Sequence, residues 1–450
     1  MKMDGANRKR RIIIFAALYL SYCAYYLCRK NYGFWLDALT SDANDSAGIP
    51  SAGVRIGKAS AGSIGSAFEL CSGVSKIALA VFVDTHSPSR ILAGALAISG
   101  FINLAIFRYL SFTEHGSQSV FVLAILWGSN GIVQSLGWPA LARIFMSWFP
   151  EPEERGRWYS LLSTNQNLGA ALAPILLTGP MSYWNWHASL YLPGFIGVTV
   201  AAFLYLTLSD SPHGASKNEK VHHTAARASS SRSARIDNSK VAEVIRKDVF
   251  RNSGIWLLAI SYFCVSVARS GLGDWALKIL GESWGLEREH AASCLFLLEV
   301  GGFLGSLGAG MVSDLLFAGK RAPVIGLLSF LTVLPILALV RTGPIARFLA
   351  LSDTSLVPFA SFFALGIFSF APHMLIGLAA REWTRPQAAS TAGGLVKFIA
   401  QVGGASAGAP LGALVTLYSW DFGLMVVAML MVTSGLAMIP VWGVQAKKTE

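Results

Sequence analysis

Residues 20–35 read LSYCAYYLCRKNYGFW, and residues 260–275 read ISYFCVSVARSGLGDW. Aligned without a gap at an offset of 240, the two stretches are identical at these pairs of positions: Ser21 and Ser261, Tyr22 and Tyr262, Arg29 and Arg269, Gly33 and Gly273, and Trp35 and Trp275. Self-similarity at a fixed separation indicates repeated structural units. The sequence therefore predicts two related halves, each with an arginine in its first predicted helix.

The composition places these halves in a lipid bilayer. The chain has 450 residues, of which 53% are hydrophobic and only 14% are charged, and its mean hydropathy is +0.51. A soluble domain of this size cannot hide so much apolar surface, whereas a helix that crosses a bilayer needs about 20 apolar residues. We predict about twelve crossings, over residues 12–40, 57–83, 89–111, 118–147, 157–178, 186–208, 253–281, 290–315, 322–341, 355–381, 388–416 and 420–443.

One long polar segment divides these crossings into two sets of six. It contains HHTAARASSSRSARIDNSK, lacks apolar periodicity and has the composition of a flexible linker. We divide the chain into an N-terminal six-helix bundle (1–209), a cytosolic linker (210–252) and a C-terminal six-helix bundle (253–450).

A second, weaker repeat supports this division. Asp84 ends the second predicted helix and Asp314 ends the eighth, and a basic residue follows each of them in a short loop. These features are typical of major facilitator transporters, in which parallel halves surround a central cavity. We therefore predict an all-α membrane protein with twelve transmembrane helices in two pseudo-symmetric bundles.

The positive charge of the chain indicates its orientation in the membrane. The formal net charge is +11, and the basic residues gather in predicted loops on one side: 8–11, 154–157, 210–251, 319–321, Arg381, Arg385, Lys447 and Lys448. The positive-inside rule places these loops and both termini in the cytosol. The charge is thereby explained without a nucleic-acid partner. The first apolar segment has no small-residue cleavage site and is predicted to be a retained helix.

Several kinds of chemistry are not indicated. The cysteines Cys23, Cys28, Cys71, Cys264 and Cys294 all lie in apolar spans without a CxxC motif, so we interpret them as packing residues. The chain has no cluster with metal-ligand spacing and no GxxxxGK[ST] phosphate loop. We predict a protein that is not an enzyme and that uses no metal, cofactor or ATP.

The repeated arginines point to an anion instead. Arg269 lies near the middle of its span, where a charge costs at least about 2.5–3.5 kcal/mol. It either forms a structural salt bridge, with Asp274 or Glu299, or binds an anion. Two arginines from equivalent positions would face each other across the cavity. Because a guanidinium meets phosphate oxygens in pairs and stays charged, the repeat favours a phosphate clamp made by Arg29 and Arg269.

Further polar residues accompany the arginines. Tyr22 and Tyr26 share a helix face with Arg29, so they are either ligands of phosphate or sugar oxygens or packing aromatics. Lys30, about 100° round the helix, either reaches the cavity or extends to the membrane surface. Glu299 is a candidate partner for a cavity cation.

Two residues of the C-terminal half have open roles. Lys397, in GGLVKFIAQVGG, either lines the pathway or pairs with an acid. His373, in FAPHMLIG, fits a satisfied packing histidine better than a proton relay.

Longer motifs resemble one family. YYLCRKNYG (25–33), QSLGWPALARIFMSWF (134–149), DWALKIL (274–280) and WNWHASLYLPG (184–194) are similar to motifs of the organophosphate:phosphate antiporters, a major facilitator family. The resemblance covers nearly the whole chain. It implies that Arg29 and Arg269 bind phosphate and that Lys30, Tyr22 and Tyr26 lie in the cavity.

Within this family, LLSTNQNLGAALAPIL (161–176) and LEVGGFLGSLGAGMVSD (298–314) most resemble the branch that carries glucose 6-phosphate in the endoplasmic reticulum. The chain departs from the bacterial glycerol-3-phosphate carriers at three positions. Gln166 replaces their cavity histidine, and Gln401 and Ser266 replace cavity tyrosines. More amides and fewer rings suit a larger, hydroxyl-rich sugar.

Two short signals concern the compartment. The chain ends in KKTE, which is either a dilysine retrieval signal of endoplasmic-reticulum proteins or ordinary cytosolic positive charge. Asn44-Asp45-Ser46 is an N-glycosylation sequon in a predicted loop on the opposite side. Together they favour the endoplasmic-reticulum membrane of a eukaryotic cell.

We therefore predict an antiporter that exchanges glucose 6-phosphate for inorganic phosphate by alternating access. Two facing cations would oppose closure of the empty cavity, and either phosphate ligand would remove that barrier. In such a compartment, the resemblance also implies that the carrier supplies a luminal phosphatase. The alternatives are a carrier of another organophosphate, such as glycerol 3-phosphate, and a sensor that binds hexose phosphate without transporting it. A major facilitator carrier of a non-phosphate substrate is disfavoured by the paired arginines.

Overall fold

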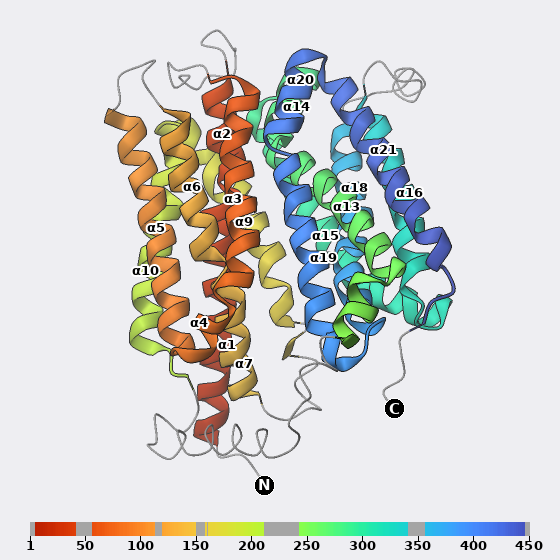
Figure 1. The fold of residues 1–450 in the computed structure, drawn as a ribbon. Coiled ribbons are helices and arrows are strands. Elements are labelled where there is room, and N and C mark those ends of the chain that lie inside the picture. Colours follow the sequence, from red (N-terminus) through yellow and green to blue (C-terminus); the bar gives the residue numbers. More distant parts are fainter. Residues whose placement is uncertain are drawn as a thin grey trace.

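The computed structural model describes residues 5–41, 56–112, 119–149, 158–159, 161–210, 243–340 and 356–445. In these ranges the secondary structure is helical throughout, without strands. The helices form two bundles that stand side by side and follow each other along the chain (Figure 1). This arrangement confirms the predicted fold class.

In the described part of the first bundle, the first, second and fourth predicted crossings are each broken into two helices. The segments are α1 (Gly5–Lys30), α2 (Tyr32–Thr40), α3 (Lys58–Ala78), α4 (Ala80–Thr85), α5 (Pro88–Phe112), α6 (Val120–Gln134), α7 (Gly137–Trp148), α9 (Asn165–Tyr183) and α10 (Ala188–Thr207).

In the second bundle the first and fifth crossings are broken, so the two bundles share a break only in their first crossing. Its segments are α13 (Ser253–Asp274), α14 (Ala276–Trp284), α15 (Arg288–Phe317), α16 (Arg321–Leu339), α18 (Val357–Glu382), α19 (Pro386–Ser406), α20 (Ala409–Leu417), α21 (Trp420–Met438) and the short 3₁₀ helix η3 (Ile439–Val441). The predicted crossings coincide with these helices within a few residues. The fifth is displaced, because α9 extends to Tyr183 where the prediction ended at residue 178.

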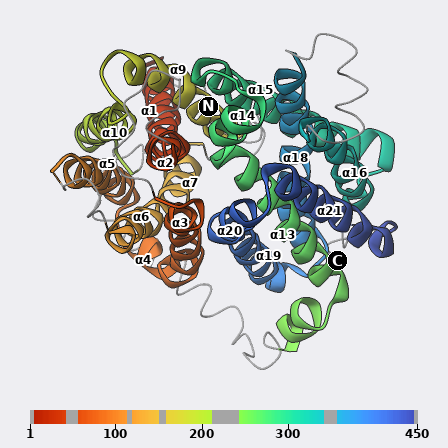
Figure 2. The ribbon, with the colours of Figure 1, turned by 90° about the horizontal axis from the view of Figure 1, so that it is seen from above.

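Ten of the described helical segments are long and apolar enough to cross a membrane. The second and fifth predicted crossings, α3 and α9, are not among them. Both carry many polar residues, for example Glu69 and Lys76 in α3 and Gln166 in α9. The same two helices pack against the opposite bundle, α3 on α19 and α20, and α9 on α15. Their polarity is therefore explained by a position at the interface between the halves (Figure 2).

The remaining surface suits a lipid environment. Many large apolar side chains are exposed on the outer helices, including Phe121 and Phe195, which are 72% and 60% exposed. Exposed apolar patches of this extent are absent from soluble monomers. A band of such residues is expected where the solvent is hydrocarbon.

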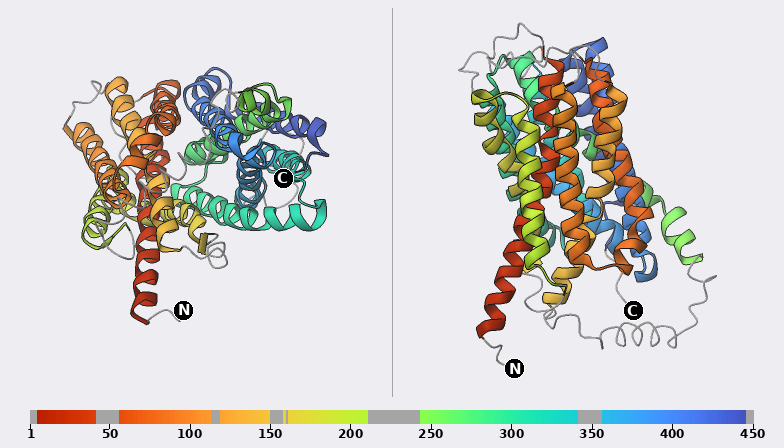
Figure 3. Two further views of the ribbon diagram at one scale, coloured as in Figure 1. Left: turned by 60° about the horizontal axis from the view of Figure 1, so that its bottom comes forward. Right: turned by 90° about the vertical axis from the view of Figure 1, so that its left-hand side faces the viewer.

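The first described helix, α1, begins at the same end of the molecule at which α21 finishes (Figures 1 and 3). We call this the terminal end, and the opposite end, where α2, α14 and α20 meet, the far end. Asn44 and the KKTE tail (447–450) lie outside the described residues. The two predicted compartment signals therefore stay predictions.

The last part of the predicted linker differs from expectation. Residues 243–245 are helical and continue into η1 (Arg246–Phe250), a π-helical turn. Asp248 in this turn is buried, and its Oδ2 accepts a hydrogen bond of 2.8 Å from Arg385 Nε, at the beginning of α19. The ion pair between buried Asp248 and half-exposed Arg385 holds this segment against the C-terminal bundle. Residues 243–250 are therefore helical where a flexible linker was predicted up to residue 252.

Close helix packing depends on glycines in both bundles. In α15, a Cβ atom on Gly305 would overlap the carbonyl oxygen of Ile367 in α18, whereas a Cβ on Gly308 meets nothing within 4 Å. Small residues allow transmembrane helices to approach in this way, where no hydrophobic effect holds them together.

We therefore expect Gly305→Ala to destabilise the protein by about 1–3 kcal/mol, as overpacked sites do. Thermal unfolding in detergent, followed by circular dichroism, measures the effect. Gly308→Ala is the matched control on the same helix. It should leave the melting temperature unchanged or raise it slightly, because alanine favours helix. Equal destabilisation by the two variants would contradict the packing role of Gly305.

Candidate functional site

The arginine of the first repeat lies beside a helix break inside the bundle. Arg29 and Lys30 end α1, and α2 begins at Tyr32 within the same apolar span, Lys9–Thr40. The side chain of Asn31 at the break donates 2.7 Å hydrogen bonds to Asn103 Oδ1 and to the Ser189 carbonyl. These hydrogen bonds anchor the break to the neighbouring helices α5 and α10. Arg29 therefore does not mark the end of a membrane crossing at the bilayer surface.

Arg29 pairs with a carboxylate that the sequence analysis missed. Its Nη2 donates to Glu69 Oε1 at 2.6 Å. Gln401 Nε2, from α19 of the opposite bundle, donates to the other oxygen, Glu69 Oε2, at 2.8 Å. Glu69 is only 7% exposed. One buried carboxylate thus joins two of the predicted binding residues, one from each half.

The predicted tyrosines differ in their surroundings. Tyr26 donates a 3.1 Å hydrogen bond to Gln166 Oε1, and the Arg29 guanidinium lies 5.8 Å from its ring centroid. Tyr22 packs against the rings of Tyr26 and Trp138, with centroids 5.5 and 5.1 Å away. Tyr26 and Gln166 therefore lie with Arg29, whereas Tyr22 fits the packing interpretation.

The arginine of the second repeat has different partners. Arg269 Nη1 donates to His373 Nε2 at 3.2 Å, and its guanidinium lies 4.1 Å from the ring centroid of Phe370. Among the described residues, no carboxylate lies within salt-bridge distance of Arg269. The expected alternative of a structural salt bridge with Asp274 or Glu299 is therefore not supported, and His373 packs as an acceptor for the arginine.

Lys397 connects the surroundings of the two arginines. Its Nζ donates to the Tyr262 hydroxyl at 3.0 Å, and the Tyr262 ring packs edge-on against His373 at 4.9 Å. Gln401 follows Lys397 by four residues on α19, so both lie on one helix face. These contacts form what we call the central polar chain: Arg29, Glu69, Gln401, Lys397, Tyr262, His373 and Arg269. Of the two roles left open for Lys397, an ion pair with an acid is not found in the described part of the chain.

A second contact between the halves lies close by. Lys30 Nζ is 3.3 Å from Asp274 Oδ1, so Lys30 points across the interface and does not extend to the membrane surface. Lys30 and Glu299 line one small cavity. Glu299 Oε2 is buried and has no hydrogen-bond partner among the described residues. Lys76, also missed from the sequence, lies on α3 within electrostatic range of Arg29, Glu69 and Lys397.

The aspartates of the loop motif lie away from this site. Asp314 forms a 2.7 Å ion pair with Arg321, whose Nε also lies 3.0 Å from Glu382, all within the C-terminal half. The motif therefore ties the end of α15 to the end of α18. Asp84 lies in α4, but its side chain is outside the described part of the structure.

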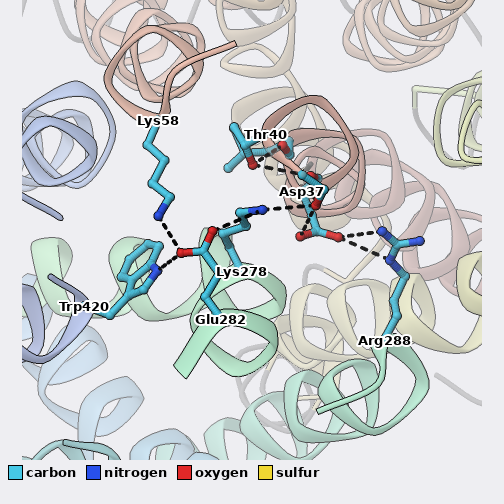
Figure 4. A network of polar contacts seen from close by, with 9 residues as sticks. Asp37, Thr40, Lys58, Lys278, Glu282, Arg288 and Trp420 are labelled. Carbon is cyan, nitrogen blue, oxygen red and sulfur yellow. Dashed lines mark hydrogen bonds and ion pairs between the residues drawn. The ribbon is translucent and has the colours of Figure 1, made fainter. Parts of the chain in front are cut away.

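The far end holds a polar network that joins the two halves (Figure 4). Asp37 of α2 forms an ion pair with Arg288 of α15, with 2.7 Å between Oδ2 and Nη2. Lys58 of α3 lies 2.5 Å from Glu282 of α14. Burial raises the pKa of the Glu282 carboxyl, but hydrogen bonds from Lys58 and Trp420 outweigh it and hold the pKa below its ordinary value. Glu282 therefore stays charged.

These contacts define which end is closed. Where both residues of a pair are described, each hydrogen bond between the halves lies at the far end or near the centre. Glycines allow the backbones to meet there as well, because a Cβ atom on Gly62 of α3 would overlap Gly408 beside α20. The structure thus represents a state in which the far end is held shut.

The sequence model of the Major Facilitator Superfamily matches residues 18–373. The chain belongs to the Major Facilitator Superfamily. The solved structure of a bacterial homologue of the human lysosomal transporter Spinster, in an inward-facing and occupied conformation, has the same fold. It has a TM-score of 0.68 at 15% identity, over 96% of each chain.

Several relatives of this Major Facilitator chain come from bacteria. A probable hexose phosphate transport protein of Chlamydia pneumoniae is 30% identical, over 98% of this chain and 93% of the relative. The membrane sensor protein UhpC of Escherichia coli is 28% identical over 99% and 95%. A glycerol-3-phosphate transporter of Bacillus subtilis is 28% identical over 94% and 90%. The resemblance to the organophosphate:phosphate antiporters is thereby confirmed.

The far-end network yields a test of the closed state. In a Major Facilitator chain the two halves must separate at one end before the other can close. We expect Asp37→Arg or Arg288→Asp alone to weaken far-end closure, because breaking a buried ion pair costs about 3–5 kcal/mol. The double swap should restore much of the loss. The measurement is labelling of an Ala38→Cys reporter by a thiol reagent in detergent.

Each single variant should increase labelling at least about tenfold, the effect of about 1.4 kcal/mol. Glu289→Arg, an exposed carboxylate in the same helix turn as Arg288, is the control and should leave labelling unchanged. Equal labelling of the single and double variants would refute the pairing of Asp37 with Arg288.

Proposed function

We propose that this chain exchanges a hexose phosphate, most specifically glucose 6-phosphate, for inorganic phosphate by alternating access. The observation that carries the proposal is the pair of arginines at equivalent positions of the two halves. Arg269 has no carboxylate partner in the described structure, and Arg29 has a single one. A guanidinium without a carboxylate partner is costly at membrane depth, and an anionic ligand offsets that cost.

The surrounding side chains supply the donors and acceptors that a sugar phosphate needs. Lys397 and the two arginines provide positive charge for the phosphoryl oxygens. The amides of Gln166 and Gln401 both donate and accept, as sugar hydroxyls require. Gln166 lies against Tyr26 of the first bundle and Gln401 belongs to the second. A ligand held among them would contact both halves.

Alternating access follows from the position of the contacts. The far end is closed by ion pairs and close helix packing, so a ligand would enter from the terminal end. A phosphate bound between the two arginines would draw the bundles together and favour closure at the terminal end. Release at the far end would then require the far-end ion pairs to break.

The cellular setting is part of the same proposal. The basic loops, the KKTE tail and the Asn44 sequon favour an endoplasmic-reticulum membrane with both termini in the cytosol. A carrier in that position would deliver sugar phosphate to a luminal phosphatase and return inorganic phosphate.

A second candidate function is a sensor. The sensor protein UhpC matches nearly the whole chain at 28% identity, about as well as the transporters do. A sensor would keep the arginine site for hexose phosphate but would not move it across the membrane. Exchange activity therefore separates the two candidates.

The test is exchange in reconstituted vesicles. We expect vesicles preloaded with glucose 6-phosphate to take up labelled phosphate, and Arg269→Lys or Arg29→Lys to reduce the rate at least about tenfold, because lysine cannot form paired hydrogen bonds. Arg90→Lys, at an exposed arginine of α5, is the matched control and should exchange normally. Near-normal rates in the two site variants would contradict the clamp.

The same vesicles identify the substrate. Preloading with glucose 6-phosphate, glycerol 3-phosphate or phosphoenolpyruvate should give the fastest phosphate uptake with the hexose phosphate. Faster exchange with glycerol 3-phosphate would favour the alternative organophosphate carrier. Binding of hexose phosphate without any exchange would favour the sensor.

A further inference from the structure

Glu69 occupies an unusual position for a carboxylate in a site built to bind anions. It lies on α3 among positive charges, and its two oxygens are held by Arg29 and Gln401 at 2.6 and 2.8 Å. Lys30 and Lys76 also lie within electrostatic range of it. The cation that should be free to receive a phosphate is therefore already neutralised.

The geometry of this carboxylate imitates a bound phosphate. A phosphate clamped between the halves would present one oxygen to a guanidinium of the first bundle and another to a donor of the second. Glu69 does the same, with Arg29 on its own half and the amide of Gln401 on the other. Carboxylate and phosphate oxygens are interchangeable acceptors for arginine.

We propose that Glu69 is a tethered counter-anion that takes the place of the ligand when the site is empty, so that the carrier also performs net transport of phosphate compounds without exchange. This inference rests on the proposed exchange function and adds a second transport mode to it. Obligatory exchange requires that the empty carrier cannot return. That barrier would come from unscreened positive charges that meet when the halves close.

The location of Glu69 makes the compensation available throughout the transport cycle. Arg29 and Glu69 belong to α1 and α3 of the same bundle, so their ion pair persists while the bundles rotate against each other. The positive charges that remain close by are Lys30, Lys76, Lys397 and Arg269. Asp274 also lies within electrostatic range of Arg29, but it is already paired with Lys30. Removal of the Glu69 charge would leave Arg29 without a carboxylate in direct contact and would raise the barrier to return of the empty carrier.

The same carboxylate competes with the ligand. A phosphate must displace Glu69 from Arg29 before it can bind there, so Glu69 weakens ligand binding while it assists empty return. Glu69→Gln should therefore improve phosphate binding but impair return of the empty carrier. The first effect lowers the KM for phosphate in exchange, and the second lowers the rate of net uptake. A purely structural role for Glu69 would weaken both binding and transport.

The experiment compares two kinds of vesicle that contain the purified full-length protein. One kind is preloaded with inorganic phosphate and the other carries no phosphate, and valinomycin with potassium clamps the membrane potential in both. Uptake of labelled phosphate into loaded vesicles reports exchange, and uptake into unloaded vesicles reports net transport. The variants are Glu69→Gln, which removes the charge, and Glu69→Asp, which retains it. Glu289→Gln, at an exposed position of α15, is the control.

We expect wild type to show net uptake well above protein-free vesicles. Glu69→Gln should lower the ratio of net uptake to exchange at least about tenfold relative to wild type, and its KM for phosphate in exchange should fall. Glu69→Asp should retain most of the net uptake. Glu289→Gln should match wild type in both modes.

Three outcomes would overturn the inference. The first is wild-type exchange without net uptake, and the second is undiminished net uptake in Glu69→Gln. The third is a proportional loss of both modes in Glu69→Gln and Glu69→Asp, which would assign Glu69 a structural role. Absence of both modes in wild type would instead refute the proposed exchange function itself, and with it this inference.

Discussion

The cost of placing an arginine charge inside a membrane governs the centre of this protein. Each half brings one such charge, from Arg29 and Arg269, to equivalent positions of the repeat. A charge at this depth needs partners, and the structure meets that need differently in the two halves. Arg29 has a carboxylate, whereas Arg269 has an imidazole nitrogen and the face of a phenyl ring. The interface helices carry the polar residues that this arrangement requires, which makes α3 and α9 less apolar than the outer helices.

The two ends of the bundle are held by different means. At the far end, ion pairs such as Asp37 with Arg288 act together with glycine contacts between α3 and α20. Glycine contacts are short-range and depend on shape, whereas ion pairs depend on charge and can be exchanged for water when the halves separate. Such a junction aligns the helices of the two halves in one specific way and can still open. The permanent contacts within each bundle are largely apolar, as expected for units that move as rigid bodies.

Much of this architecture could be predicted from the sequence, because hydropathy and an internal repeat are properties of the linear chain. The pairing of charges could not. Asp274 follows Arg269 by five residues, which places it about 140° round the helix, so it pairs with Lys30 of the other half. Glu69 was missed although a signal existed. Ser66, Glu69, Gly73 and Lys76 recur at helical spacing along one face of α3, and this polar stripe faces Gln401 and its neighbours.

For the phosphate ligand that we propose, the unequal partners of the two arginines also imply an order of binding. Among the described residues no carboxylate contacts Arg269, so an incoming phosphate would gain that guanidinium by displacing only the weaker contact with His373. At Arg29 it must compete with a 2.6 Å ion pair. Engagement of the second half should therefore precede release of Arg29 by Glu69. Since Glu69 also holds Gln401, its release frees a donor of the second bundle at the moment when both halves can grip the ligand. The two arginines occupy equivalent positions of the repeat, but Glu69 contacts only Arg29. This difference would make the two arginines bind the ligand one after the other.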